Sequence, residues 1–146
     1  MIKLKEALVI AEAALKMARI RQLNPMSVAV LDARGCLVAF QMEDGSSLLR
    51  EDIAKAKGLS ALALGMGTRA LVGRAKHHPA FFVGLSALSK GNMIPVPGGV
   101  LIRSPLDAAI VGAVGVSGDL PDHDEACAIA GIEATTYSWD AGADPS

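Results

Sequence analysis

The sequence contains few aromatic residues, two cysteines and no long apolar run. Phe, Tyr and Trp together make up 3% of the 146 residues, so stacking platforms for nucleic-acid bases are scarce. The 14 Lys and Arg residues are balanced by 15 Asp and Glu, which leaves no basic excess for a phosphate backbone. No stretch reaches the roughly 18 uninterrupted apolar residues of a membrane-spanning helix. We therefore expect neither nucleic acid nor a membrane as a partner.

The two cysteines, Cys36 and Cys127, are far apart and form no CxxC pair. We interpret them as two small buried apolar residues in a reducing compartment. Near the amino terminus, Lys3, Lys5 and Glu6 interrupt the apolar residues. This pattern does not fit the continuous apolar region of a signal peptide. We therefore expect a cytoplasmic protein.

The size and composition are typical of one domain. A chain of 146 residues is within the usual range for a single domain and can bury a core without a metal or disulfide. The apolar fraction is 51%, so this core must consist of Ala, Val, Leu and Ile, with Met as filler. We expect one domain over residues 1–134 and a polar, flexible tail over residues 135–146.

Hydrophobic periodicity predicts alternating groups of helices and strands. Apolar residues spaced by three and four predict helices over residues 4–20, 48–64, 68–73, 79–88 and 121–133. Short β-rich runs predict strands over residues 27–32, 36–42, 92–96, 100–103 and 109–116. Strands joined by short turns pair antiparallel. The predicted fold is therefore α+β, with helices packed on a five-stranded antiparallel sheet.

Glycines mark two places in the second half of the chain. Pro97-Gly98-Gly99 is typical of a tight hairpin turn, in which glycine adopts positive φ without steric cost. Gly112 and Gly115 lie inside an expected strand, where glycine weakens the strand unless another backbone or a ligand comes close. We expect a ligand or a neighbouring subunit to approach there.

Four carboxylates crowd the start of the last predicted helix: Asp119, Asp122, Asp124 and Glu125. Carboxylates are stabilised at the positive end of a helix dipole, so capping can explain one or two of them. The other carboxylates either bind a ligand or metal ion or have a purely structural role. The spacing does not fit a calcium loop.

Three further positions are candidates for chemistry. His77 and His78 precede Pro79 and form either a solvated helix end or a site in which one imidazole serves as a haem ligand or general acid/base. Asp44 lies in a polar loop after a strand, where functional residues are common. Lys55 lies on a helix face rich in alanine, which fits either an exposed lysine or a pocket residue.

The carboxyl-terminal half resembles a known family. Pro97-Gly98-Gly99-Val100, the run VGAVGVSG over residues 111–118, and Asp124-Glu125 followed by CAIAG over residues 127–131 are similar to the signature of the GlcG/HbpS family, also called the haem-degrading domain family. The first half follows the family's order of elements more loosely. The resemblance implies a profilin-like fold, with a five-stranded antiparallel sheet flanked by helices, and a homo-oligomer, dimer or higher.

The resemblance implies two kinds of function. Some members bind haem, and a related domain ends the PduO cobalamin adenosyltransferases. Another relative, 4-hydroxylaminobenzoate lyase, converts an aromatic acid to a catechol and ammonia. We expect a small-molecule-binding protein whose ligand is haem or a related molecule. The alternative is a cofactor-free lyase or isomerase acting on a small acid in a catabolic pathway.

Each reading assigns its own residues. A haem would take His77, His78 or His123 as axial ligand. A lyase needs a positive anchor and a proton-transfer group. Its anchor would be Lys55 or Arg103, and Gly98 and Gly99 would approach the ligand. The proton-transfer candidates are Asp44, His78, Asp124 and Glu125, whose carboxylates would need burial to raise their pKa toward neutrality.

Overall fold

The computed structural model describes residues 1–143 and confirms an α+β fold. The elements in chain order are α1 (Leu4–Ile20), β1 (Ser27–Asp32), β2 (Leu37–Met42), α2 (Arg50–Leu64), α3 (Arg69–His77), α4 (Pro79–Leu88), β3 (Gly99–Arg103), β4 (Ile110–Ser117), α5 (Pro121–Glu133) and β5 (Ser138–Asp140). The five strands form one antiparallel sheet in the order β2-β1-β4-β3-β5.

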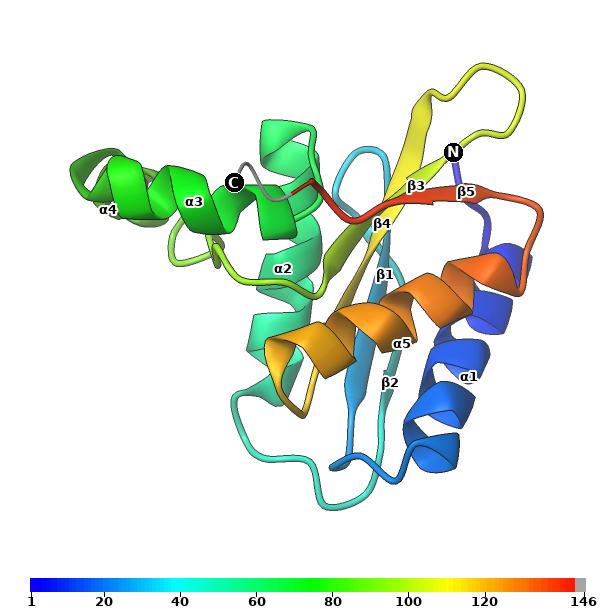
Figure 1. The fold of residues 1–146 in the computed structure, drawn as a ribbon. Coiled ribbons are helices and arrows are strands. Elements are labelled where there is room, and N and C mark those ends of the chain that lie inside the picture. Colours follow the sequence, from blue (N-terminus) through cyan, green and yellow to red (C-terminus); the bar gives the residue numbers. More distant parts are fainter. Residues whose placement is uncertain (144–146) are drawn as a thin grey trace.

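Helices cover both faces of this sheet (Figure 1). α1 and α5 lie on one face, where the alanines of α1 pack against alternate apolar residues of β1, β3 and β4, such as Val28, Val100 and Val114. α2 lies on the other face, and α3 and α4 project beyond the sheet. Side chains alternate between the faces of a strand, so β1, β3 and β4 bury both of theirs.

Gly115 allows α2 to lie unusually close to the sheet. A Cβ atom at this position would be 1.8 Å from the carbonyl oxygen of Ala54 in α2. Helix and strand therefore pack backbone against backbone, as small residues permit. The close approach at Gly115 is therefore made by α2 of the same chain, and not by the ligand or neighbouring subunit that we expected.

The expected strand over residues 92–96 is wrong. Pro95 and Pro97 interrupt this segment and cannot donate ladder hydrogen bonds. Met93 instead joins a buried cluster with Leu71 and Phe82. Gly98, at φ 123°, precedes β3 and is not part of a hairpin turn. The hairpin is formed by β3 with β4.

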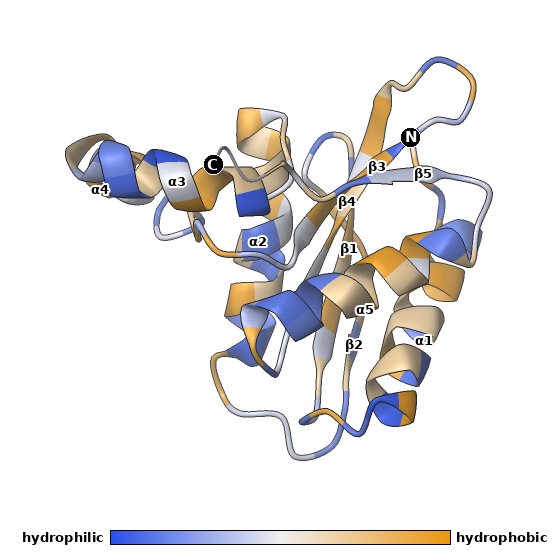
Figure 2. Cartoon of the chain, in the orientation of Figure 1, coloured by the Kyte–Doolittle hydropathy of each residue, from blue (hydrophilic) through white to orange (hydrophobic). Residues whose placement is uncertain are grey.

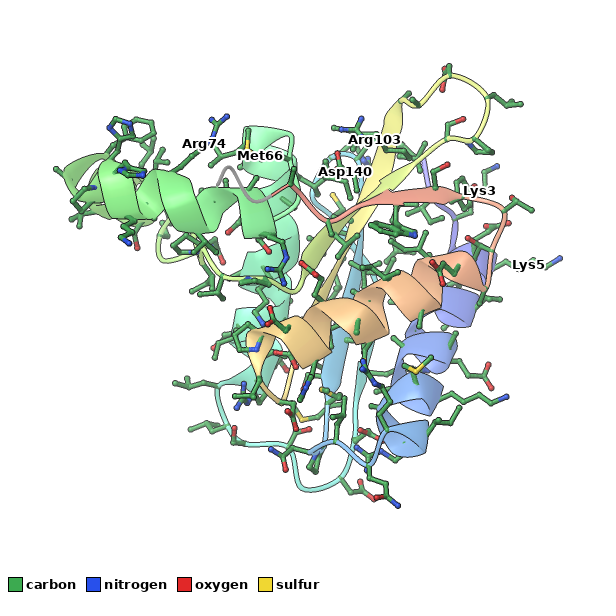
Figure 3. All side chains as sticks on the ribbon, in the orientation of Figure 1. Lys3, Lys5, Met66, Arg74, Arg103 and Asp140 are labelled. Atoms are coloured by element: carbon green, nitrogen blue, oxygen red, sulfur yellow. The ribbon has the colours of Figure 1, made fainter. Side chains whose placement is uncertain are left out.

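The chain after residue 134 is not an irregular tail throughout, because Ser138–Asp140 pair with β3 as strand β5. Arg103 donates two hydrogen bonds to Asp140 Oδ2, at 2.8 and 3.1 Å, and the two side chains lie together in Figure 3. Strand β5 lacks the hydrophobic colour of β3 in Figure 2. This explains why apolar patterning missed it. Residues 144–146 of the expected tail lie outside the described part of the chain.

None of the helices in residues 1–143 is long and apolar enough to cross a membrane.

Candidate functional site

The break between α3 and α4 creates a pocket with apolar walls. Proline disfavours helical geometry in the residue before it, and His78, before Pro79, has φ −132° and ψ 60°. α3 therefore ends at His77, and Pro79 begins α4 at a position where its missing N–H costs nothing. This break places His78 beside Phe82, in the first turns of α4.

The pocket has a volume of about 200 Å³ and is lined by Leu64, Arg74, His78, Phe81 and Phe82. Phe82 is buried, whereas Phe81 is 61% exposed, and their rings meet edge to face at 5.9 Å. Arg74 is exposed, and its side chain extends away from α3 in Figure 3. The site thus combines apolar walls with one imidazole and one guanidinium at its rim.

The other two histidines differ from His78 in their surroundings. His77 is exposed and does not line the pocket. His123 Nδ1 lies 2.7 Å from Asp119 Oδ1 at the start of α5. Of the residues expected to ligate haem, His78 is therefore the one placed in an apolar pocket.

A second polar centre lies in the core, where Lys57 Nζ donates to Asp124 Oδ2 at 3.0 Å and to the Val116 carbonyl at 2.9 Å. The side chains are 2% and 1% exposed. Burial lowers the pKa of Lys57 and raises the pKa of Asp124, and each charge opposes the shift of its partner. Asp124 also accepts a hydrogen bond from the Asp119 amide at 2.9 Å. The pair ties α2 to α5.

The remaining carboxylates of the acidic helix start also have partners within the chain. Arg69 pairs with Glu125 at 2.9 Å and also with Asp122, which ties α3 to α5. Asp119 accepts from the Asn24 and Leu120 amides, and these bonds help to hold its pKa at about 2. Within residues 1–143, no group of three or more His, Cys, Asp or Glu side chains could hold a metal ion.

The glycines expected to contact a ligand are buried. A Cβ atom on Gly98 would be 2.7 Å from Lys57 Nζ, and one on Gly99 would be 2.2 Å from the Lys57 carbonyl oxygen. The Gly99 amide donates to Thr68 Oγ1 at 2.8 Å. These close contacts let β3 pack over α2 and the start of α3.

The other expected site residues lie apart from one another. Lys55 is paired with Glu51 at 3.1 Å on the surface of α2, and Arg103 is paired with Asp140. Both expected anchors thus already contact carboxylates. Asp44 is exposed and lines a separate pocket of about 450 Å³ with Arg19 and Glu43. The structure does not bring Asp44, His78 and Asp124 into one site.

Sequence reasoning did not identify Lys57, Arg69 or the pocket residues around His78. For Lys57 a signal existed, because it lies three residues after Ala54 and four before Ala61, on the buried face of α2. The partners of Arg69 are more than 50 residues away in sequence. No local pattern could have indicated them.

The chain has clear relatives. Residues 2–133 match the model of the HbpS-like haem-degrading protein family. A haem complex of PduOC has a TM-score of 0.84 and 23% identity, covering 94% of this chain and 96% of that one. No curated protein matches significantly.

Two further solved structures are similar. Klebsiella pneumoniae protein ORFY has a TM-score of 0.83 and 26% identity over 91% of this chain and 89% of its own. A double mutant of Streptomyces reticuli HbpS has a TM-score of 0.77 and 26% identity over 90% and 85%.

Proposed function

The chain belongs to the HbpS-like haem-degrading protein family, and we propose that it binds haem at the α3–α4 pocket. The observation that supports this proposal is that His78 lies among Leu64, Phe81 and Phe82, with Arg74 at the rim. The haem complex of PduOC supports the choice of ligand.

The residues of the pocket fit the chemistry of haem. The macrocycle needs apolar walls, and the leucine and the two phenylalanines would pack against one edge of the ring, because a pocket of about 200 Å³ is too small to enclose all of it. Bound haem would supply an iron centre that an imidazole can ligate, and His78 would be the residue that holds it. A guanidinium pairs well with carboxylates, so Arg74 would hold a propionate group.

A haemin titration followed by absorption spectroscopy tests this function. We expect a shifted Soret band that saturates at one haemin per chain. Phe81→Ala should weaken binding, because it removes a wall of the pocket from an exposed position without opening the core. Val83→Ala is the matched control, since Val83 is 71% exposed on the same helix and does not line the pocket. The absence of a Soret shift at micromolar haemin, or equal affinities for the two variants, would contradict the proposal.

We also propose that the chain forms a homo-oligomer through α4. Phe81 and Leu88, seven residues apart on one face of this helix, are 61% and 81% exposed, and exposed apolar side chains that share a face are typical of interaction surfaces. Sedimentation velocity should show a species larger than the 15.0 kDa chain. A monomer at all concentrations would contradict self-association and would leave the haem titration unaffected.

A further inference from the structure

A polar pocket at the opposite end of α2 has no role in haem binding. It has a volume of about 290 Å³ and is lined by Asn24, Pro25, Gly45, Ser46, Ser47, Arg50 and Gly118. Arg50 begins α2 and Leu64 ends it, so the two pockets are separated by about 20 Å of helix at 1.5 Å per residue. In Figure 1 the loop before α2 and the α3–α4 pair lie at opposite ends of this helix. The two sites can therefore be tested independently.

Arg50 is the positive group of this pocket. Its Nη1 donates to Ser117 Oγ at 3.0 Å, and the guanidinium forms no ion pair with a carboxylate in residues 1–143. It is only partly exposed. A guanidinium has five donors in a planar fork, so the single bond to Ser117 leaves donors for a ligand. The other side chains of the pocket that can donate are neutral.

The neighbouring carboxylates that could neutralise Arg50 already have partners. They are Glu43 with Arg19 at 2.9 Å, Glu51 with Lys55 at 3.1 Å, and Asp119 with backbone amides and His123. Asp124, whose charged form is also stabilised by Arg50, is bound to Lys57 at 3.0 Å. Asp52, in the first turn of α2, is 74% exposed and 4.0 Å from Lys55. Asp44 is exposed in the loop and lines the adjacent pocket. Within residues 1–143, none of these carboxylates forms an ion pair with Arg50 itself.

Two further features favour an anion. The N-cap residue Leu49 makes no side-chain capping bond, so the first backbone amides of this 15-residue helix can serve as donors beside Arg50, although Glu51 and Asp52 in the same first turn offset the positive end of the helix dipole. Ser27 Oγ is fully buried and has no hydrogen-bond partner. Ser27 lies directly opposite Ser117 in the β1–β4 register, beside the hydroxyl that Arg50 contacts. A buried hydroxyl without a partner is unusual and requires an explanation.

We propose that this pocket binds a small monocarboxylate through Arg50. A single guanidinium matches one carboxylate, and the two can form parallel N–H···O bonds. The hydroxyls of Ser46 and Ser47 would serve as additional donors, and the apolar ring of Pro25 leaves room for a short carbon chain. A guanidinium pairs with phosphate as well as with carboxylate, so the choice of a carboxylate rests on the apolar surface that Pro25 adds to the pocket.

A titration followed by two-dimensional amide NMR tests this site. Sodium acetate, butyrate and benzoate are added to the full chain at constant ionic strength, with sodium chloride and inorganic phosphate in parallel. We expect saturable shifts for at least one carboxylate, centred on Gly45, Ser46, Ser47 and Gly118. Arg50→Gln should weaken binding about tenfold or more, equivalent to about 1.4 kcal/mol, whereas Arg34→Gln, at an exposed arginine paired with Asp32 between β1 and β2, should leave it unchanged.

Arg50→Lys keeps the charge, loses the planar fork and should bind with intermediate affinity, so this variant serves if Arg50→Gln does not fold. The proposal is overturned if no carboxylate gives saturable shifts, if Arg50→Gln binds as the wild type does, or if phosphate binds more tightly than every carboxylate. A Soret titration of the same Arg50→Gln protein should be normal. Failure of this site is therefore distinguishable from failure of the haem site.

Discussion

Lys57 Nζ lies 3.0 Å from Asp124 Oδ2, and neither side chain is more than 2% exposed. This contact joins two helices that pack on opposite faces of the sheet. It also passes beside Gly98, where any larger residue would collide with the lysine. The acidic helix start and the glycine pair of the sequence signature thus belong to one packing unit.

Removal of one partner from this pair should destabilise the fold strongly. Lys57→Met leaves Asp124 buried without its cation, and breaking a buried pair in this way costs about 3–5 kcal/mol. The double variant Lys57→Met/Asp124→Leu should lose much less, because no unpaired charge remains. Urea unfolding of the single and double variants measures both values of the free energy of unfolding. A double variant as unstable as the sum of the single variants would show that the two residues do not interact.

Gly115→Ala should also be destabilising. The new Cβ would be 1.8 Å from the Ala54 carbonyl oxygen, so α2 must shift from the sheet, and we expect a loss of more than about 2 kcal/mol. Gly84→Ala is the control, because nothing lies within 4 Å of a Cβ on this α4 residue. Replacement of glycine in a helix should stabilise by roughly 0.5–1 kcal/mol. Thermal unfolding gives the melting temperature of each variant, and that of Gly115→Ala should be the lower. Equal melting temperatures would contradict this packing.

Asp119 should make stability depend on acid pH. Its pKa is held at about 2, below the usual value of 3.8, because backbone amides of Asn24 and Leu120 and the His123 side chain form hydrogen bonds with the charged carboxylate. Because the pKa is lower in the folded state, the contribution of Asp119 to the free energy of unfolding is complete above about pH 4. This contribution is lost as the pH falls through 3.8 toward 2. The difference in unfolding free energy between the wild type and Asp119→Asn should shrink over this window. A carboxyl titration by NMR with a midpoint near 4 would be inconsistent with these bonds.

The two cysteines should react differently with iodoacetamide. The expectation that both are buried is wrong for Cys36, which is exposed at the turn between β1 and β2. Cys127 is buried, and burial raises the pKa of its thiol to about 11. Since the thiolate is the reactive form, mass spectrometry of the folded protein should find Cys36 modified and Cys127 intact. Both should be modified in urea. Equal modification rates under native conditions would show that α5 is not packed as described.

The local patterns of the sequence predicted the helices more reliably than the strands. The break at Pro79 and the helix starting at Pro121 follow from backbone chemistry and are present. The segment around Pro95 was wrongly predicted as a strand because its apolar residues pack in the α3–α4 cluster. Strand β5 depends on pairing with β3 and on the Arg103–Asp140 contact, neither of which leaves a periodic signal.

The candidate site was predictable only in part. His78 was identifiable from its position before proline, but its distinction from His77 depends on the orientation of the chain at the helix break. The four carboxylates of α5 gave the strongest local signal, yet their partners Lys57 and Arg69 come from distant helices. Spacing in a sequence does not reveal whether a carboxylate already has a partner.

Haem binding through His78 is decided by comparing haemin affinity in His78→Ala and His77→Ala, two exposed adjacent positions of which only one lines the pocket. We predict that His78→Ala lowers the affinity about tenfold or more, about 1.4 kcal/mol, and that its Soret spectrum is restored by added imidazole. His77→Ala should bind as the wild type does. Wild-type affinity and spectrum in His78→Ala, or an equal loss in both variants, would contradict the assignment of His78 as the axial ligand.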